Sequence, residues 1–594
     1  MRRQLEKLRE KMKEAGISAY VVPTEDYHAS EYVGDYFKCR AYVSGFTGSA
    51  GTLAVTMDKA GLWTDGRYFL QAGGQLQGSG IDLYKMGMPG VPTLDTFLKE
   101  ELPTGGVLGF DGRTVSAAQG KAWDKLAAEK SGSVKTDRDL AGEIWEDRPA
   151  LAANPARTLD VSYTGMSTRD KLGKLREAMK EKGAAAHLLT SLDDIAWLFN
   201  IRGTDVAFNP VVMAYAFITE TEAVLYAEAS AFSGEDQKTL LAQGVSIKPY
   251  FAVYEDVKAI PAGTTVLLDE ERVNDHLVRS IPQGVSIVSD VNPTTMWKAV
   301  KNETELAWAR RVHVRDGAAL TKFLYWIKKQ AGKEAITEIS AADRLEAFRK
   351  EQEGFLGLSF ETIAGYEKHG AIIHYSATPE TDIPLAAQGI LLVDSGAQYE
   401  GGTTDVTRTF ALGPVTDREK QMFTLVLAGM LRLGAARFPE GTNGVNLDVL
   451  ARQPLWERGL DYRHGTGHGV GSFLNVHEGP NRLAQKDTGA RYKWGFVPGM
   501  VTSDEPGYYE DGAFGIRCEN LMVCVPDGEG DYGKFCRFEF LTWAPFDPDL
   551  LDISLFSERD KELYNAYQAE VYEKIAPLLD EEERAWLKEV TKAV

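Results

Sequence analysis

Cysteine is scarce in this chain of 594 residues, and its scarcity excludes one class of architecture. The four cysteines include no C-x-x-C pair and are Cys39, Cys518, Cys524 and Cys536. So few thiols in so long a chain argue against a disulfide framework and fit a reducing compartment best. We therefore expect a cytoplasmic protein.

Long apolar runs and an excess of positive charge are also missing. No uninterrupted apolar stretch approaches the ~18 residues that a membrane span requires. The opening MRRQLEKLREKM has no apolar segment behind its two arginines, so it is typical of an amphipathic helix and not of a secretory signal. A net charge of -20 disfavours a nucleic-acid or anionic-membrane surface. We expect a soluble protein that binds neither nucleic acid nor membrane.

An internal repeat dominates the first half of the chain, whose total length allows two to four domains at roughly 150 residues each. Residues 7–16 read KLREKMKEAG and residues 174–183 read KLREAMKEKG, so eight of ten positions are identical. Each copy is followed by an apolar, strand-like run, AYVVP or AAHLLTS. This order is typical of α/β domains and predicts two related domains.

Two breaks divide the chain into three predicted domains. The segment 148–165 is rich in Pro, Ala and small polar residues and is interpreted as a linker near 150–160, although one long surface loop is an alternative. A second break falls at Asn292-Pro293, after which Asn302 or Thr304 can cap a helix that begins around Glu305. Helical spacing after Ser557 predicts two C-terminal helices. The predicted domains are 1–155, 156–300 and 301–594.

A first predicted hairpin brings two carboxylates together in the third domain. Asp394 ends the apolar strand GILLVD, and Asp405 follows the turn-forming YEGGTTD before a second strand. A turn near 399–402 sets the two aspartates almost opposite one another. Paired buried carboxylates repel unless a proton or cation intervenes, which favours a divalent metal. Two ordinary turn aspartates remain the alternative.

A second predicted hairpin adds another pair of acids. A turn centred on Gly512 sets Glu505 opposite Glu519, and Glu519 lies in an apolar strand where an unpaired carboxylate costs several kcal/mol. We expect a cation there. The alternatives are a salt bridge from Arg517 or a strand edge that exposes Glu519.

The segment 464–477, HGTGHGVGSFLNVH, places histidines four residues apart. Its interleaved glycines would destabilise a helix by about 1 kcal/mol each, so we predict a strand or loop in which His464 and His468 share a face. No Lys-Ser or Lys-Thr follows the glycines, which excludes a phosphate-binding loop. The chain has neither a G-x-S-x-G elbow nor an H-E-x-x-H helix, which removes the simplest serine-hydrolase and zinc-peptidase interpretations.

Taken together, these motifs resemble the M24 or "pita-bread" metallopeptidases, and the aminopeptidase P branch in particular. The strings that carry the resemblance are SGFTGSAG, WTDGRY, AIIHYS, VDSG, TTDVTRT, HGTGHGVGSFLNVHEGP, EPGYYEDGAFGIRCEN and LTWAPFD. The resemblance implies an α/β protein with two creatinase-like N-terminal domains and an α+β catalytic domain that ends in a helical extension. It also implies five metal ligands, namely Asp394, Asp405, His468, Glu505 and Glu519.

The resemblance implies a mechanism as well. Two divalent ions, Mn²⁺ first and Co²⁺ or Zn²⁺ as alternatives, suit four carboxylates and one imidazole, and a hydroxide that bridges them would attack the peptide carbonyl. Glu505 would move the proton. His374 and His477 would stabilise the tetrahedral intermediate, and His464 would form a wall of the proline pocket.

The implied activity is removal of the N-terminal residue from peptides whose second residue is proline, by a homodimer. Two alternatives stay open. A prolidase would share the metals but would need a basic residue for the free carboxylate of its dipeptide, and the doubled N-terminal domain favours the aminopeptidase. A non-catalytic peptide-binding protein on the same fold would be expected to have lost ligands, and none is missing.

Overall fold

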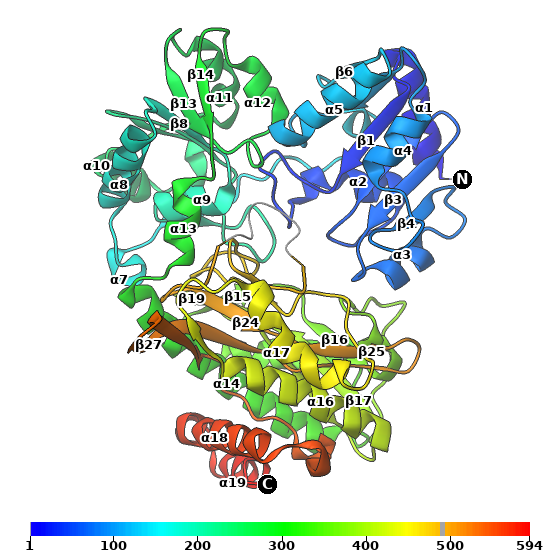
Figure 1. Cartoon of the computed structure of the whole chain (residues 1–594), viewed down its shortest axis with the longest axis vertical. Coiled ribbons are helices and arrows are strands. Elements are labelled where there is room, and N and C mark those ends of the chain that lie inside the picture. Colours follow the sequence, from blue (N-terminus) through cyan, green and yellow to red (C-terminus); the bar gives the residue numbers. More distant parts are fainter. Residues whose placement is uncertain (1, 487–493) are drawn as a thin grey trace. The chain divides into compact units, whose positions relative to one another are not determined.

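The computed structural model describes residues 2–486 and 494–594 (Figure 1). Its chain divides into two compact units. Unit 1 comprises the chain up to Asp160 together with Met166–Thr294, and unit 2 comprises Val161–Gly165 and Thr295–Val594. Each unit is described by itself below.

The first half of unit 1 is a six-stranded mixed sheet with helices. In spatial order its strands are β4 (Asp82–Lys85), β3 (Ala60–Thr64), β2 (Thr52–Thr56), β1 (Ala19–Pro23), β5 (Val107–Phe110) and β6 (Ser133–Lys135). Its helices are α1 (Arg3–Ala15), α2 (Cys39–Ser44), α3 (Phe69–Gln75), α4 (Leu94–Glu101), α5 (Ala117–Glu129) and α6 (Leu140–Glu143). β1 pairs antiparallel with β2 and parallel with β5.

The second half of unit 1 repeats this topology. Its strands are, in spatial order, β12 (Ser246–Lys248), β11 (Ala223–Tyr226), β10 (Tyr215–Thr219), β8 (Ala186–Leu189), β13 (Thr265–Leu268) and β14 (Ser286–Ser289). Its helices are α8 (Thr168–Glu181), α9 (Leu192–Leu198), α10 (Gly234–Ala242), α11 (Val253–Asp256) and α12 (Asp275–Ser280). β8 pairs antiparallel with β10 and parallel with β13, as β1 does with β2 and β5. Unit 1 therefore consists of two related domains that follow one another along the chain, as the repeat predicted.

The repeated sequence explains how each half begins. α1 and α8 are both followed by a glycine with a left-handed backbone, Gly16 at φ 64° and Gly183 at φ 66°. Glycine adopts this conformation without strain, so it ends the helix and turns the chain toward the first strand. The segment predicted as a linker is more ordered than expected, because β7 (Ala156–Thr158) pairs with β9 (Ile201–Gly203). α13 (Pro293–Ala299) then leads to unit 2.

Unit 2 is built from antiparallel strands in several small sheets. The strands that precede helix α16 (Asp417–Gly434) are β15 (Phe355–Leu358), β16 (Ile363–Tyr366), β17 (Ile390–Ser395), β18 (Ala397–Tyr399), β19 (Gly402–Thr403) and β20 (Val406–Ala411). Those after α16 are β21 (Arg437–Pro439), β22 (Gly467–His468), β23 (Arg482–Leu483), β24 (Val501–Asp504), β25 (Gly507–Glu510), β26 (Phe514–Arg517), β27 (Asn520–Gly530) and β28 (Gly533–Phe540).

The helices of unit 2 pack against these strands. They are α7 (Val161–Thr164), α14 (Glu303–Gln330), α15 (Glu338–Lys350), α16 (Asp417–Gly434), α17 (Gly444–Trp456), α18 (Glu558–Ile575) and α19 (Glu581–Val590). Asn302 caps α14 and accepts N–H bonds from Thr304 and Glu305, so the predicted cap is Asn302 and the helix begins two residues earlier than expected. The two predicted C-terminal helices are α18 and α19, which lie next to α14 (Figure 1).

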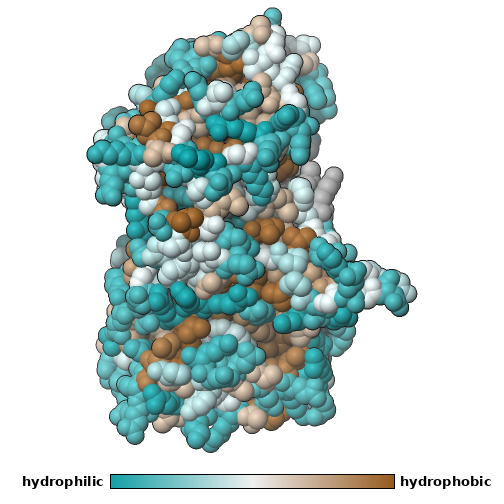
Figure 2. All heavy atoms as spheres, turned by 90° about the vertical axis from the view of Figure 1, so that its left-hand side faces the viewer, coloured by the Kyte–Doolittle hydropathy of each residue, from teal (hydrophilic) through white to brown (hydrophobic). Residues whose placement is uncertain are grey.

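The core of unit 2 is centred on α16. Phe423, Val426 and Met430 are fully buried there, and Tyr564 and Val571 of α18 belong to the same apolar cluster. The face of the molecule in Figure 2 is mostly hydrophilic with small, scattered apolar patches. Among the described residues, no helix combines the length and the apolar character that a membrane crossing needs.

Candidate metal centre

The first predicted hairpin forms in the expected register. β17 pairs antiparallel with β20, and Asp394 lies opposite Thr407. β18 and β19 continue the hairpin to a pairing of Tyr399 with Gly402, so the turn falls where the sequence predicted it. Asp405 precedes β20 by one residue. The turn thus brings Asp394 and Asp405 to the same end of the hairpin, both more than nine-tenths buried.

The second predicted hairpin also forms in the expected register. β24 pairs with β27 so that Asp504 faces Asn520, and β25 pairs with β26 so that Gly507 faces Arg517. Both ladders share one register, which leaves Glu505 and Glu519 opposite one another between them. Gly512 has φ 73° at the centre of the turn, a conformation that suits glycine.

The histidine-rich segment is extended, as its glycines predicted. β22 pairs with β23, and His468 faces Arg482. Side chains would collide in this segment, because a Cβ on Gly467 would lie 2.0 Å from the Ser503 carbonyl oxygen. The close approach of the backbone therefore requires glycine and brings His468 to the strand that leads to Glu505.

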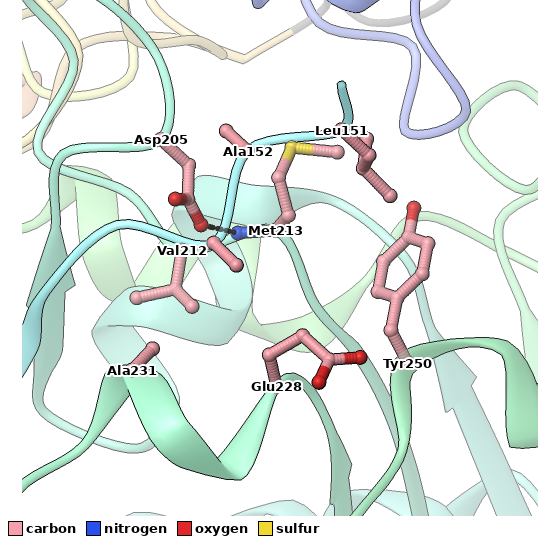
Figure 3. Close-up of a pocket in the computed structure, with 9 residues that line it drawn as sticks. Leu151, Ala152, Asp205, Val212, Met213, Glu228, Ala231 and Tyr250 are labelled. Carbon is pink, nitrogen blue, oxygen red and sulfur yellow. Dashed lines mark hydrogen bonds between the residues drawn. The ribbon is translucent and has the colours of Figure 1, made fainter.

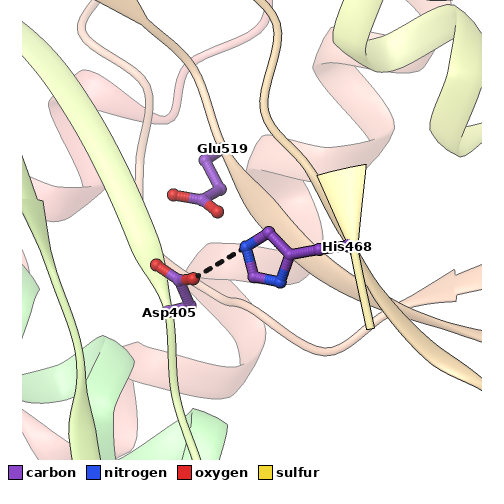
Figure 4. Close-up of side chains that lie close together, drawn as sticks. All are labelled: Asp405, His468 and Glu519. Carbon is purple, nitrogen blue, oxygen red and sulfur yellow. Dashed lines mark ion pairs between the residues drawn. The ribbon is translucent and has the colours of Figure 1, made fainter. Parts of the chain in front are cut away.

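These elements converge on one cluster (Figure 4). Ligand atoms of Asp405, His468 and Glu519 all lie within 4.8 Å of one another. Nε2 of His468 is 3.5 Å from Oδ2 of Asp405 and 3.3 Å from Oε1 of Glu505. Its Nδ1 faces the Gly469 carbonyl oxygen at 2.9 Å, which leaves Nε2 as the nitrogen that points at the carboxylates.

Burial makes this cluster electrostatically costly. Burial raises the pKa of the Glu519 carboxyl well above its ordinary value, and nearby Asp405 and Asp394 raise it further. Burial likewise raises the pKa of Glu505, against the opposing effect of His468. The pKa of His468 rises to about 9 because Asp405 and Glu505 together outweigh the effect of burial, which favours the neutral ring.

Arg517 is the cation beside the cluster, and it pairs with an unexpected carboxylate. The sequence left open a salt bridge from Arg517 to Glu519, but its Nη2 binds Oδ2 of Asp394 at 2.6 Å. Arg517 and a protonated His468 ring offset only two of the four charges when all four carboxylates are ionised. Oδ1 of Asp394 and Oε1 of Glu519 are buried and have no hydrogen-bond partner in the described part of the chain. These two unsatisfied oxygens fit divalent cations, which take oxygen ligands.

Sequence reasoning missed two residues that orient the centre. Thr407 donates its hydroxyl to Oε2 of Glu519 at 2.7 Å. Tyr509 accepts from Nη1 of Arg517 at 2.7 Å and lies 2.9 Å from Nε2 of His464. Thr407 could have been found, because it lies two positions after Asp405 and residues that alternate along a strand share a face.

The three other predicted histidines lie at different places around the cluster. The ring of His477 packs edge-on against that of His468, with centroids 4.3 Å apart. His464 lies outside the short strand β22 and is held by Tyr509 and by the Gly465 carbonyl oxygen. His374 follows β16 and a turn, and its neighbour Ile373 directs a carbonyl oxygen to within 3.5 Å of Nη2 of Arg517. Their functional roles remain predictions.

A separate pocket in unit 1 contains none of the predicted site residues (Figure 3). Its acidic wall residue Asp205 accepts N–H bonds from Met213 and Asn154, each at 2.7 Å. Glu228 and Tyr250 also line the pocket. The carboxylate of Asp205 is therefore satisfied by the backbone around it.

The fold and the donor set define the class: two copies of an α/β domain followed by a hairpin domain with a carboxylate-rich metal centre. Residues 4–148 and 147–305 match models of the creatinase/prolidase N-terminal domain. Residues 307–526 match metallopeptidase family M24, and residues 534–594 match the C-terminal region of that peptidase. The chain belongs to the M24 metallopeptidases, in the branch formed by the Xaa-Pro aminopeptidases P.

Full-length relatives carry that assignment. The "Probable Xaa-Pro aminopeptidase P" of Laccaria bicolor is 42% identical over 98% of this chain and 92% of its own length. "Aminopeptidase P2" of Arabidopsis thaliana is 40% identical over 95% of this chain and 84% of its own. The crystal structure of X-prolyl aminopeptidase from Caenorhabditis elegans, described as a cytosolic enzyme with a di-nuclear active site, is 35% identical and superposes with a TM-score of 0.94 over 100% of this chain and 99% of its own.

Proposed function

We propose that this chain removes the N-terminal residue from peptides whose second residue is proline. The observation that carries the proposal is the convergence of Asp405, His468 and Glu519 on one buried cluster, in a chain that matches Xaa-Pro aminopeptidases along its length. The names of these relatives support the substrate class. The intact donor set supports catalysis and argues against a peptide-binding protein that has lost its metals.

The proposed ligands are the five residues that the resemblance implied. Asp405 and Glu519 would be shared by two divalent ions, Asp394 would complete the shell of one, and the other would take His468 and Glu505. Four hard oxygen donors and one imidazole suit Mn²⁺. When bound, two such ions polarise a carbonyl group and lower the pKa of a water molecule.

The side chains around the ions have distinct proposed roles. Glu505 is the proton carrier, because its side chain is 18% exposed while that of Asp405 is 6% exposed, so it can both face the ions and reach the substrate. His374 and His477 would donate hydrogen bonds to the oxygen that gains charge in the transition state. His464, fixed by Tyr509, would form the wall of the proline pocket.

Proline accounts for the need of a dedicated site. Its nitrogen carries no N–H, and its ring fixes φ near -65°, so a peptidase that binds an extended backbone through that N–H does not hold it. A shaped apolar wall replaces the missing hydrogen bond. The reaction then requires proton delivery to the prolyl nitrogen, which is the role proposed for Glu505.

We also propose that the enzyme works in the cytoplasm as a homodimer. The four cysteines are all free and buried, which suits a reducing compartment. Light scattering of the purified protein measures its oligomeric state directly. A mass of about 130 kDa, twice the 65.4 kDa of one chain, is expected, and a mass of one chain would overturn it.

The deciding experiment compares two substrates. Purified protein with Mn²⁺ is incubated with an Ala-Pro-Ala tripeptide and an Ala-Pro dipeptide, and release of alanine is measured. Cleavage of the tripeptide supports the proposal, and cleavage of the dipeptide alone would identify a prolidase. Asp405→Asn is the control, because it keeps the side-chain shape but removes a proposed bridging charge. Metal binding without cleavage of either peptide would favour the peptide-binding alternative.

A further inference from the structure

Glu338 is a buried carboxylate of unit 2 that lies outside the proposed metal ligands, and hydrogen-bond donors face both of its oxygens. Glu338, in the first turn of α15, is 0% exposed. Its Oε1 accepts the N–H of Tyr366 at 2.8 Å, and its Oε2 accepts the hydroxyl of Tyr375 at 2.8 Å. Nδ1 of His369 lies 2.9 Å and 3.0 Å from the two oxygens.

All three donors belong to one short segment, residues 366–375, which we call the His374 segment. Burying a carboxylate costs several kcal/mol unless hydrogen bonds satisfy it, and bonds to a charged acceptor are about twice as strong as neutral ones. Glu338 also lies at the N-terminus of α15, where the helix dipole favours negative charge. The His374 segment is therefore tied at three points to one rigid helix end.

The opposite side of the segment contacts the strand that leads to the metal centre. A Cβ on Gly515 of β26 would lie 1.7 Å from the carbonyl oxygen of Gly370, so the two backbones are in direct contact. Further along, the Ile373 carbonyl oxygen lies 3.5 Å from Nη2 of Arg517, which binds Asp394. The segment is thus enclosed between Glu338 and β26, and His374 stands at its end.

We propose that Glu338 and Tyr375 are positioning residues for His374. The inference rests on the proposed function, because it concerns the same reaction. Tyr375 adjoins His374 in the chain, and its hydroxyl is bound by Glu338 at one side and lies 3.3 Å from the Thr381 carbonyl oxygen at the other. Because Tyr375 is held in place, the backbone of the neighbouring His374 has little freedom, and so has its imidazole ring.

The test is a double-mutant cycle on turnover of an Ala-Pro-Ala peptide. Tyr375→Phe removes one hydroxyl and is expected to lower kcat by about 10- to 100-fold, the cost of a misplacement near 1 Å, with KM little changed. In a His374→Ala background the same change should alter the residual kcat less than about two-fold, since coupled residues are not additive. Metal content should be unchanged in every variant.

Controls separate positioning from general loss of stability. Tyr564→Phe removes a buried hydroxyl from α18, where it accepts from Gln568 at 2.9 Å, and should leave kcat unchanged. Glu338→Gln should resemble Tyr375→Phe, and Glu346→Gln on the same helix should resemble the wild type. Hydrogen exchange should rise in the His374 segment of Tyr375→Phe and of Glu338→Gln, and in neither of the two control variants.

Two results would overturn the inference: an unchanged kcat in Tyr375→Phe, or an equal loss in the wild-type and His374→Ala backgrounds. If Glu338→Gln does not fold, the milder Tyr375→Phe still decides. A wild-type protein that leaves Ala-Pro-Ala intact would instead refute the proposed function, so the two failures are distinguishable.

Discussion

Replacing Glu519 by glutamine should stabilise the metal-free protein although it removes a proposed ligand. Glu519 is 1% exposed, and its Oε1 has no hydrogen-bond partner in the described residues. One of its oxygens lies within 4.8 Å of one oxygen of Asp405, which amounts to a repulsion of about 3.5 kcal/mol between two charges at an effective dielectric constant of 20. Glutamine keeps the shape and can still accept from Thr407, but it carries no charge.

The pH dependence of this effect follows from the raised pKa of Glu519. When the pH rises above 4.5, the ordinary pKa of a glutamate, Glu519 loses its proton in the unfolded chain. The folded chain holds this proton more tightly, so the free energy of unfolding falls as the pH rises. Protonation relieves the repulsion in the wild type, and it becomes easier as the pH falls toward 4.5. The advantage of Glu519→Gln should therefore be large at pH 7.5 and small at pH 5.

Thermal unfolding of chelator-treated protein measures this difference. At roughly 2 °C per kcal/mol for a large unit, relief of the repulsion of about 3.5 kcal/mol should raise the transition of unit 2 by up to about 7 °C at pH 7.5 in Glu519→Gln. The control Glu529→Gln, on the exposed end of β27, should shift little. Saturating Mn²⁺ should reverse the order, because only the wild type gains full binding energy. A stripped Glu519→Gln variant less stable than the stripped wild type would refute the reasoning.

Three further predictions concern other parts of unit 2. Asn302→Ala removes the cap of α14 and should cost about 1 kcal/mol of stability, seen as a lower Tm with kcat unchanged. Arg408→Met should cost roughly 3–5 kcal/mol, measured by thermal unfolding, because the buried guanidinium satisfies the Glu519 carbonyl oxygen at 2.6 Å and Asn520 at 2.8 Å. Tyr509→Phe breaks the link between Arg517 and His464 and should lower kcat/KM for proline peptides about 10-fold at constant metal content. A Tm unchanged in either of the first two variants, or a kcat/KM unchanged in the third, would contradict the corresponding account.

Local turn chemistry made both hairpins predictable. Gly512 and the turn at 399–402 set strand registers, and a register fixes which residues face each other over the whole hairpin. The opposition of Glu505 and Glu519 followed from that alone. The doubled N-terminal domain was predictable for a different reason, because the repeated helix is visible in the sequence itself.

Long-range contacts were not predictable in the same way. Arg517 is two residues from Glu519, yet it binds Asp394, 123 positions earlier in the chain. Strand alternation places Arg517 and Glu519 on one face, but the choice of partner depends on how two hairpins meet. Glu338 likewise gave no signal, since a single glutamate at a helix start is ordinary and its donors lie 28 to 37 positions away.

Metal stoichiometry against turnover tests the central claim most directly. Chelator-treated protein is titrated with Mn²⁺ while cleavage of Ala-Pro-Ala is followed, and bound metal is counted by elemental analysis. The account predicts no turnover without metal and a plateau of turnover at about two bound ions per chain. Asp405→Asn should show neither turnover nor this plateau. Full turnover in the stripped protein, or the wild-type plateau retained in Asp405→Asn, would contradict it.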